Sequence, residues 1–249
     1  MCPFQVLLIL TLHSLIVFCS LEVLKKQCDY NPQKILDVGA NVGHWTQGMK
    51  KVFPSAKFVM IEGNEDHKSV LEKSGVPFII LLVGSKTENI TFYKFEGTGT
   101  GNSIYRENTA SFKNIKEITK PIDTIDNIVI RYKLGTFDFI KLDIQGNELN
   151  ALKGAISTLR FTEVLLVEIA IMNYNEGSPK FFDVFQFLNR IGYAVFDISE
   201  MSRDSRNMLV QIDVIWIKKE SKLWDKKCTN YPRPNFNLSF NRKKSGITW

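Results

Sequence analysis

Residues 35–45 of the chain read Ile-Leu-Asp-Val-Gly-Ala-Asn-Val-Gly-His-Trp, and this stretch decides the fold. An apolar run ends at Gly39, a second glycine follows at Gly43, and a helical pattern begins directly behind it. Gly39 allows a sharp turn at the end of a strand, and Gly43 allows the next helix to approach closely. Backbone N–H groups at the start of that helix can then bind a ligand. The stretch therefore predicts a strand, a turn and a helix beside a binding crevice; a tight turn without a ligand is the alternative.

Around this stretch, apolar strands alternate with helical patterns, which is typical of a parallel sheet covered by helices. The early strands are nearly continuous apolar runs, as expected when both faces are buried, whereas the last two are joined by a polar stretch and should pair antiparallel. Strands are expected at 34–39, 56–62, 77–84, 137–143, 164–170, 193–198 and 211–218, helices at 147–159 and 179–191, an extra hairpin at 89–95, and a long functional loop at 96–119. The fold class is α/β, with a seven-stranded, mostly parallel sheet, an antiparallel last strand and helices on both faces.

The composition is that of one globular domain. The 249 residues are 44% hydrophobic and 23% charged, which excludes collagen-like, disordered acidic and polytopic membrane proteins. The formal charge of +6 is compatible with an acidic glycan, a membrane or a nucleic acid as partner, but does not select among them. A solvated basic surface is the commoner explanation.

The N-terminal segment differs from the rest, because residues 6–19 are almost wholly apolar and no ionic side chain precedes Glu22. This run is shorter than the ~20 residues of a membrane-spanning helix, which favours a cleaved signal peptide over a retained signal anchor, with a buried helix as the third alternative. We divide the chain into this segment at 1–24, one domain at 25–230 and a basic polar tail at 231–249. The expected location is the secretory pathway, with membrane contact only through an uncleaved N-terminal segment.

Two cysteines, Cys28 and Cys228, lie near the two ends of the expected domain. In an oxidising compartment they can form one disulfide, although two inert thiols are the alternative for a pair so far apart in sequence. The bridge is favoured. Glycosylation sequons at Asn89 and Asn237 agree with the secretory location.

Glu62 ends the second expected strand, where a carboxylate can accept both hydroxyl hydrogens of a ribose. It therefore indicates a nucleoside ligand, with capping of a helix at 64–66 as its structural alternative. Dinucleotide-binding enzymes use Gly-x-Gly-x-x-Gly at the first turn, but Asn41 and His44 occupy the second and third glycine positions here. A nicotinamide cofactor is therefore disfavoured.

Three motifs together carry a specific family resemblance. They are Asp-Val-Gly-Ala-Asn-Val-Gly at 37–43, Phe-Ile-Lys-Leu-Asp-Ile-Gln-Gly-Asn-Glu-Leu at 139–149 and Leu-Lys-Gly-Ala at 152–155. The chain resembles the FkbM-type S-adenosylmethionine-dependent methyltransferases over roughly 34–218. The resemblance implies a Rossmann-like class I methyltransferase fold and methyl transfer from S-adenosylmethionine to an oxygen, often a hydroxyl of a sugar or a secondary metabolite. It assigns the cofactor site to Asp37, Gly39, Asn41, Gly43, Glu62 and Asp143.

The acceptor side departs from the family pattern, with Gln145 where many relatives carry glutamate and Ala170 where many carry histidine. A sulfonium already activates its methyl group, so catalysis consists of positioning and of removing the hydroxyl proton. Asp143 and Glu168 end two central strands and are the candidates for the base or for holding the acceptor. Their structural alternatives are a helix cap for Asp143 and an ion pair for Glu168. His44 is a weaker candidate base, and no spacing of ligands predicts a metal site.

The expected function is therefore O-methylation of a hydroxyl on a glycan, lipid or small metabolite. A secreted protein that kept the fold and lost turnover is the alternative, motivated by Gln145 and Ala170. A nucleic-acid methyltransferase is disfavoured, because the basic stretch at 233–244 lacks an interleaved aromatic stacking platform. We expect no nucleic-acid partner.

Overall fold

The structure is a computed structural model, and it describes residues 20–95, 101–108, 115–229 and 233–236. The apolar run at 6–19, the sequon at Asn237, most of the basic tail and parts of the long loop expected at 96–119 lie outside the described residues. Among the residues described, no helix is both long enough and apolar enough to cross a membrane.

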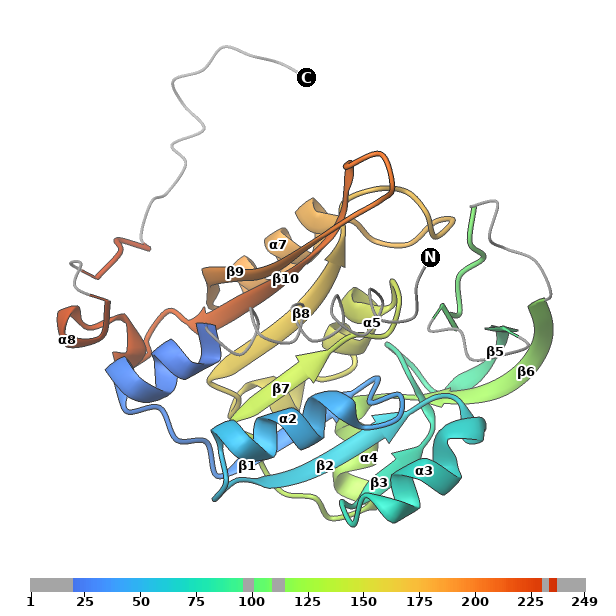
Figure 1. The fold of residues 1–249 in the computed structure, drawn as a ribbon, viewed down its shortest axis with the longest axis horizontal. Helices are drawn as coiled ribbons and strands as arrows, with labels where there is room; N and C mark the ends of the chain where they lie inside the picture. Colours follow the sequence, from blue (N-terminus) through green and yellow to red (C-terminus); the bar gives the residue numbers. More distant parts are fainter. Residues whose placement is uncertain (1–19, 96–100, 109–114, 230–232, 237–249) are drawn as a thin grey trace, which may run out of the picture.

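Seven strands of the described chain form one sheet in the spatial order β3-β2-β1-β7-β8-β10-β9 (Figure 1). Neighbouring strands are parallel except at β10, which runs antiparallel to both β8 and β9. The strands are β1 Lys34–Val38, β2 Lys57–Glu62, β3 Phe78–Ile80, β7 Phe139–Leu142, β8 Val164–Ala170, β9 Tyr193–Arg203 and β10 Leu209–Lys218. This arrangement confirms the expected class I methyltransferase fold. The strand order reverses between β1 and β7, where open α/β sheets bind their ligands.

Helices cover both faces of this sheet, as expected. Successive side chains of a strand point to opposite faces, so the apolar residues of one strand pack against helices on both sides. On β1, Leu36 and Val38 join one core cluster with α4, α5, α6 and α7, whereas Ile35 joins a second cluster with α2, α3 and the helical residues 20–28. The helices are α2 His44–Val52, α3 Lys68–Lys73, α4 Ile125–Arg131, α5 Glu148–Lys153, α6 Ile156–Leu159, α7 Phe181–Arg190 and α8 Lys226–Thr229, with 3-10 turns η1 Glu65–His67 and η2 Lys222–Trp224.

A second sheet of three strands, in the order β4-β6-β5, lies beside the first. Its strands are β4 Leu82–Val83, β5 Glu88–Phe95 and β6 Ile115–Asp123. The single strand expected at 77–84 is wrong, because the chain leaves the main sheet after β3 and β4 pairs with β6 instead. The loop expected at 96–119 is also wrong at its end, where β6 begins and pairs antiparallel with β5 along its whole length. The hairpin expected at 89–95 is wrong in its bounds, because these residues belong to one strand, β5, whose antiparallel partner is β6.

Two expected helices differ in their bounds. The helix at 147–159 is divided into α5 and α6 at Gly154, where a Cβ atom would lie 2.1 Å from the Gly84 carbonyl oxygen. The close approach of these two backbones ends α5. The helix expected from 179 begins at Phe181, where the Asp183 carboxylate accepts a hydrogen bond from the Lys180 N–H at 2.9 Å.

The two ends of the domain are joined. Cys28 and Cys228 form the expected disulfide, with their Cα atoms 4.6 Å apart. Leu21 and Leu24, on the helical residues 20–28, are fully buried in the second core cluster. The helix before the first strand is thus part of the packed core.

Candidate active site

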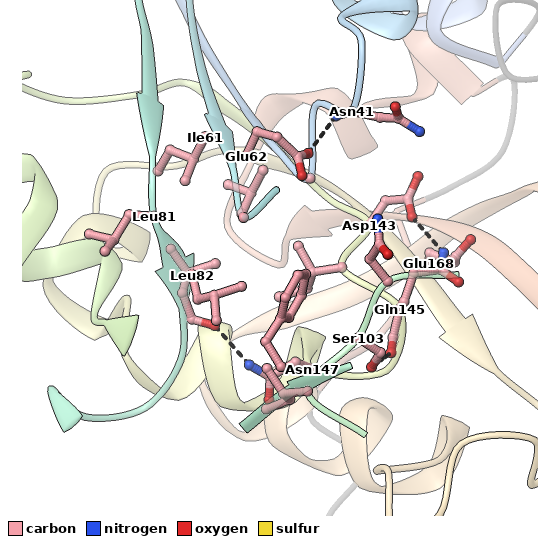
Figure 2. Close-up of a pocket in the computed structure, with 18 of the residues that line it drawn as sticks. Asn41, Ile61, Glu62, Leu81, Leu82, Ser103, Asp143, Gln145, Asn147 and Glu168 are labelled. Atoms are coloured by element: carbon pink, nitrogen blue, oxygen red, sulfur yellow. Dashed lines mark hydrogen bonds between the residues drawn. The ribbon is translucent and has the colours of Figure 1, made fainter. Parts of the chain in front are cut away.

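A cavity of about 360 Å³ opens at the carboxyl ends of β1, β2, β7 and β8 (Figure 2). Its volume lies within the roughly 300–1,000 Å³ of small-ligand sites. One side is formed by the turn after β1 and the end of β2, and the other by the turn after β7 and the end of β8. The small sheet contributes apolar side chains at its margin, among them Leu82 and Phe92.

The turn after β1 has the left-handed backbone that its sequence requires. Gly39 and Gly43 both have φ of +82°, and a Cβ atom on Gly39 would lie only 1.8 Å from the Asp143 carbonyl oxygen. Asn41 has φ of +51°, and asparagine is one of the few residues that tolerate this conformation. Asn41 can therefore replace the middle glycine of the motif without changing the turn.

Glu62 links the end of β2 to this turn. One of its carboxylate oxygens accepts a hydrogen bond from the Asn41 N–H and the other from the Asn64 N–H, each at 2.7 Å. His67 also lines the cavity, with its Nδ1 atom 3.7 Å from Glu62 Oε1. Only 19% of the His67 side chain is exposed, because η1 folds it toward Glu62.

The residues assigned to the cofactor by resemblance do not all reach the cavity. Gly39, Asn41, Glu62 and Asp143 line it, whereas Asp37 and Gly43 lie behind the lining. At Gly43 a Cβ atom would contact Leu71 and Met60 at 3.4 Å, so this glycine serves helix packing.

Asp37 is fully buried and organises the turn from beneath. Its Oδ2 accepts a hydrogen bond from Thr46 Oγ1 at 2.6 Å, and its Oδ1 lies 3.6 Å from the Lys141 ammonium. Burial raises the pKa of Asp37, although Lys141 and Thr46 both oppose this rise. Through these contacts Asp37 fixes α2 and β7 to the end of β1.

Asp143 and Glu168 lie together where the cavity meets β7 and β8, but in different electrostatic environments. Asp143 Oδ2 lies 3.0 Å from the Lys141 ammonium, and 34% of the Asp143 side chain is exposed. Burial by itself would raise the pKa of Asp143, but the charge and hydrogen bond of Lys141 outweigh it and hold the pKa below its usual value. Asp143 is therefore the ionised carboxylate at neutral pH. The N-cap of α5 is Asn147, so the helix-cap alternative for Asp143 does not hold.

Glu168 is enclosed by amides. Gln145 Nε2 donates to its Oε2 at 3.0 Å, and Gln211 Nε2 donates to its Oε1 at 2.5 Å. Burial, followed by the charges of Asp143 and Asp213, raises the pKa of Glu168 well above its usual value. Glu168 is therefore the carboxyl group of the pair that holds its proton more tightly. The amides replace the ion pair that was its structural alternative.

Gln145 joins the two carboxylates, since its Nε2 also donates to Asp143 Oδ1 at 3.2 Å. Its backbone is left-handed at φ of +56°, a conformation that persists only where the surroundings enforce it. The Gln145 carbonyl oxygen accepts from Ser103 Oγ at 2.7 Å and from Asn175 Nδ2 at 2.9 Å. These two residues thus fix the backbone carbonyl group of Gln145 from two separate loops.

Several of these contributors were missed from the sequence: Lys141, Ser103, Asn175 and Gln211. Lys141 carried a usable signal, because a lysine within a buried apolar strand requires carboxylate partners. The others come from distant loops and strands and had no spacing relative to the motifs. His44 is exposed at the start of α2 and does not line the cavity. Among the described residues, no group of three or more His, Cys, Asp or Glu could hold a metal ion.

Comparison with known proteins gives one family match. The family model described as Methyltransferase FkbM domain matches residues 37–195. No curated protein matches the chain.

Solved structures resemble the chain at low sequence identity. The plantazolicin methyltransferase BamL, in complex with a triazolic desmethylPZN analog and SAH, is 11% identical over 82% of this chain and 85% of its own, with a TM-score of 0.48. The O-methyltransferase from Bacillus cereus, in complex with SAH, is 10% identical over 88% of this chain and 82% of its own, with a TM-score of 0.46. Precorrin-6y C5,15-methyltransferase from Geobacter metallireducens is 11% identical over 79% and 85%, with a TM-score of 0.42.

Proposed function

The chain belongs to the FkbM family of S-adenosylmethionine-dependent methyltransferases, and from this premise we propose that it methylates a hydroxyl oxygen, with Asp143 receiving the hydroxyl proton. The observation that carries the proposal is the contact between the Gly39 turn and Asp143. A Cβ atom at Gly39 would lie 1.8 Å from the Asp143 carbonyl oxygen, so the cofactor turn and the proposed base adjoin without an intervening side chain.

The residues of the cavity fit S-adenosylmethionine. A carboxylate has about four lone-pair positions, and Glu62 uses two of them for backbone N–H groups, which leaves two for the hydroxyls of a ribose. The carboxylates of the lining suit a cationic ligand. When bound, the cofactor supplies a methyl group that is already activated by the sulfonium. Gly39, Asn41, Glu62 and Asp143 are the residues that would hold it.

Asp143 and Glu168 differ in the direction of their pKa shifts, and we assign them different roles toward the acceptor. The ionised Asp143 accepts a hydrogen bond from the acceptor hydroxyl and takes its proton as the oxygen becomes acidic. Lys141 keeps Asp143 ionised and supports it from the protein side. Glu168, held between Gln145 and Gln211, can orient the acceptor through hydrogen bonds.

Labelled S-adenosylmethionine offered with glycan, lipid and small-metabolite extracts tests the function, because transfer of label does not require the acceptor to be known. We expect label in an acceptor and its loss in Asp143→Asn. The matched control is Asp29→Asn, at an exposed ion pair with Lys227 on the opposite end of the strands. A wild-type protein that neither binds the cofactor nor transfers label would overturn the proposal.

The second candidate is a secreted binding protein that has the fold without turnover. The observation that favours it is the Gln145 amide, which occupies both carboxylates of the acceptor side. It would bind S-adenosylmethionine in calorimetry without transferring label. For either function we propose the secretory pathway as the location; the Cys28–Cys228 disulfide and the apolar run at 6–19 support it.

A further inference from the structure

The cavity is acidic although the chain as a whole is basic. The formal charge is +6, yet the ionisable residues among the described lining are Glu62, His67, Asp143 and Glu168, and neither lysine nor arginine occurs in that part of the lining. The net positive charge of the protein therefore does not extend to the described lining of the cavity.

The ammonium group beside Asp143 cannot serve an incoming anion. Lys141 is only 7% exposed, and its Nζ lies 3.0 Å from Asp143 and 3.6 Å from Asp37. An anionic group beside Asp143 would meet a like charge, and the described lining holds no lysine or arginine that would offset it. At a separation of 4 Å and an effective dielectric constant near 20, such a contact weakens binding by roughly a thousandfold.

The polar remainder of the cavity is uncharged. Asn102, Ser103, Gln145, Asn147 and Gln211 supply amide and hydroxyl groups to the lining. Such groups donate to and accept from hydroxyls without preferring a charge. A carboxylate nucleophile would also have no proton for Asp143 to remove, whereas a hydroxyl has one.

We propose that the acceptor carries no negative charge near the reacting hydroxyl, so that the enzyme forms methyl ethers on uncharged polyhydroxy compounds and rejects those with a carboxylate, phosphate or sulfate beside that hydroxyl. This inference rests on the proposed function. It selects the acceptor class by charge, which the family membership does not do.

The test uses a total glycan and polar-lipid extract that is divided on an anion-exchange resin into an unbound and a salt-eluted fraction. Both fractions receive labelled S-adenosylmethionine and the wild-type protein. We expect at least tenfold more label in the unbound fraction per mole of hydroxyl. Equal labelling, or more label in the salt-eluted fraction, would overturn the inference and leave the methyltransferase intact. Label in neither fraction would overturn the proposed function itself.

A matched set of variants tests the cause. Asn102→Lys adds a cation to the lining, and we expect it to raise the share of label in the salt-eluted fraction about tenfold. Ser205→Lys adds the same charge at an exposed position between β9 and β10, outside the lining, and should leave the share unchanged. Asn102→Gln adds no charge but alters the hydrogen bond that Asn102 Oδ1 accepts from the Phe95 N–H, so it measures the effect of that bond alone. An equal shift in all three variants would contradict selection by charge.

Discussion

Replacing Glu62 with alanine should weaken cofactor binding and also destabilise the free protein. The Glu62 carboxylate accepts two backbone hydrogen bonds of 2.7 Å, from Asn41 and from Asn64. Two lone-pair positions remain for the ribose. The variant therefore removes contacts to the ligand and, at the same time, the acceptors of two N–H groups that shape the site.

The two effects differ in size and in cause. Loss of two ribose hydrogen bonds at about 1 kcal/mol each raises the dissociation constant about 30-fold. In the free protein, Asn64 is buried, so its N–H group loses its acceptor at a cost of about 1–3 kcal/mol. Asn41 is half-buried and water can reach its N–H group, so the total loss of stability should be nearer 2 than 6 kcal/mol.

Calorimetric titration with S-adenosylhomocysteine and urea unfolding measure the two effects separately. Glu62→Gln keeps one oxygen acceptor and should lie between wild type and alanine in both measurements. Glu72→Ala, at an exposed position on α3, is the control for removing a glutamate. A Glu62→Ala protein that is folded and binds within threefold of wild type would refute the assignment of Glu62 to the ribose.

Three further predictions concern the disulfide, the proposed base and the buried carboxyl group of Asp213. Replacing both Cys28 and Cys228 with serine should lower stability to urea by about 5 kcal/mol in the chain-entropy model for a bridge across 200 residues; two alkylatable thiols in the secreted protein would contradict the bridge. Asp143→Asn should lower methyl transfer by about 10² to 10⁴ while most of the cofactor affinity is kept, and Glu168→Gln should cost less; the opposite ranking in a label-transfer assay would move the base to Glu168. Burial and the charge of Asp143 raise the pKa of Asp213 to about 7. The folded protein therefore binds the Asp213 proton more tightly than the unfolded chain does. The stability that this provides is fully present below the ordinary pKa of 3.8 and is lost as the pH rises through 7. Urea unfolding between pH 5 and 8 should therefore show a decline that is smaller in Asp213→Asn, and equal slopes in the two proteins would refute that pKa.

The cofactor side could be predicted from the sequence because it is built from neighbouring residues. Strands buried on both faces read as continuous apolar runs, and left-handed positions favour glycine and asparagine, so 35–43 reveals both the strand and its turn. The strand β6 was missed because it carries four ionic side chains and lies in a small sheet with one exposed face. Nothing local in its sequence shows that β5 would pair with it.

The acceptor side could not be predicted in the same detail, because its geometry depends on contacts between distant segments. Gln211 reaches Glu168 only because β10 pairs antiparallel with β8, with Gln211 opposite Ala170. The antiparallel strand was predicted, but its register was not, and a shift of one residue would turn Gln211 to the other face of the sheet.

The contacts of Gln145 indicate that changes of acceptor specificity in this protein should arise from substitutions in loops and not in the cofactor motif. Its left-handed backbone is held by Ser103 from one loop and by Asn175 from another. These loops are joined to each other, because the Asn108 N–H donates to the Tyr174 carbonyl oxygen at 2.6 Å. A substitution in either loop can therefore shift the Gln145 backbone, and through it the side-chain amide that donates to Asp143 and Glu168, while the cofactor turn stays fixed by Asp37 and Glu62. The acceptor can change in this way without any change at the cofactor motif.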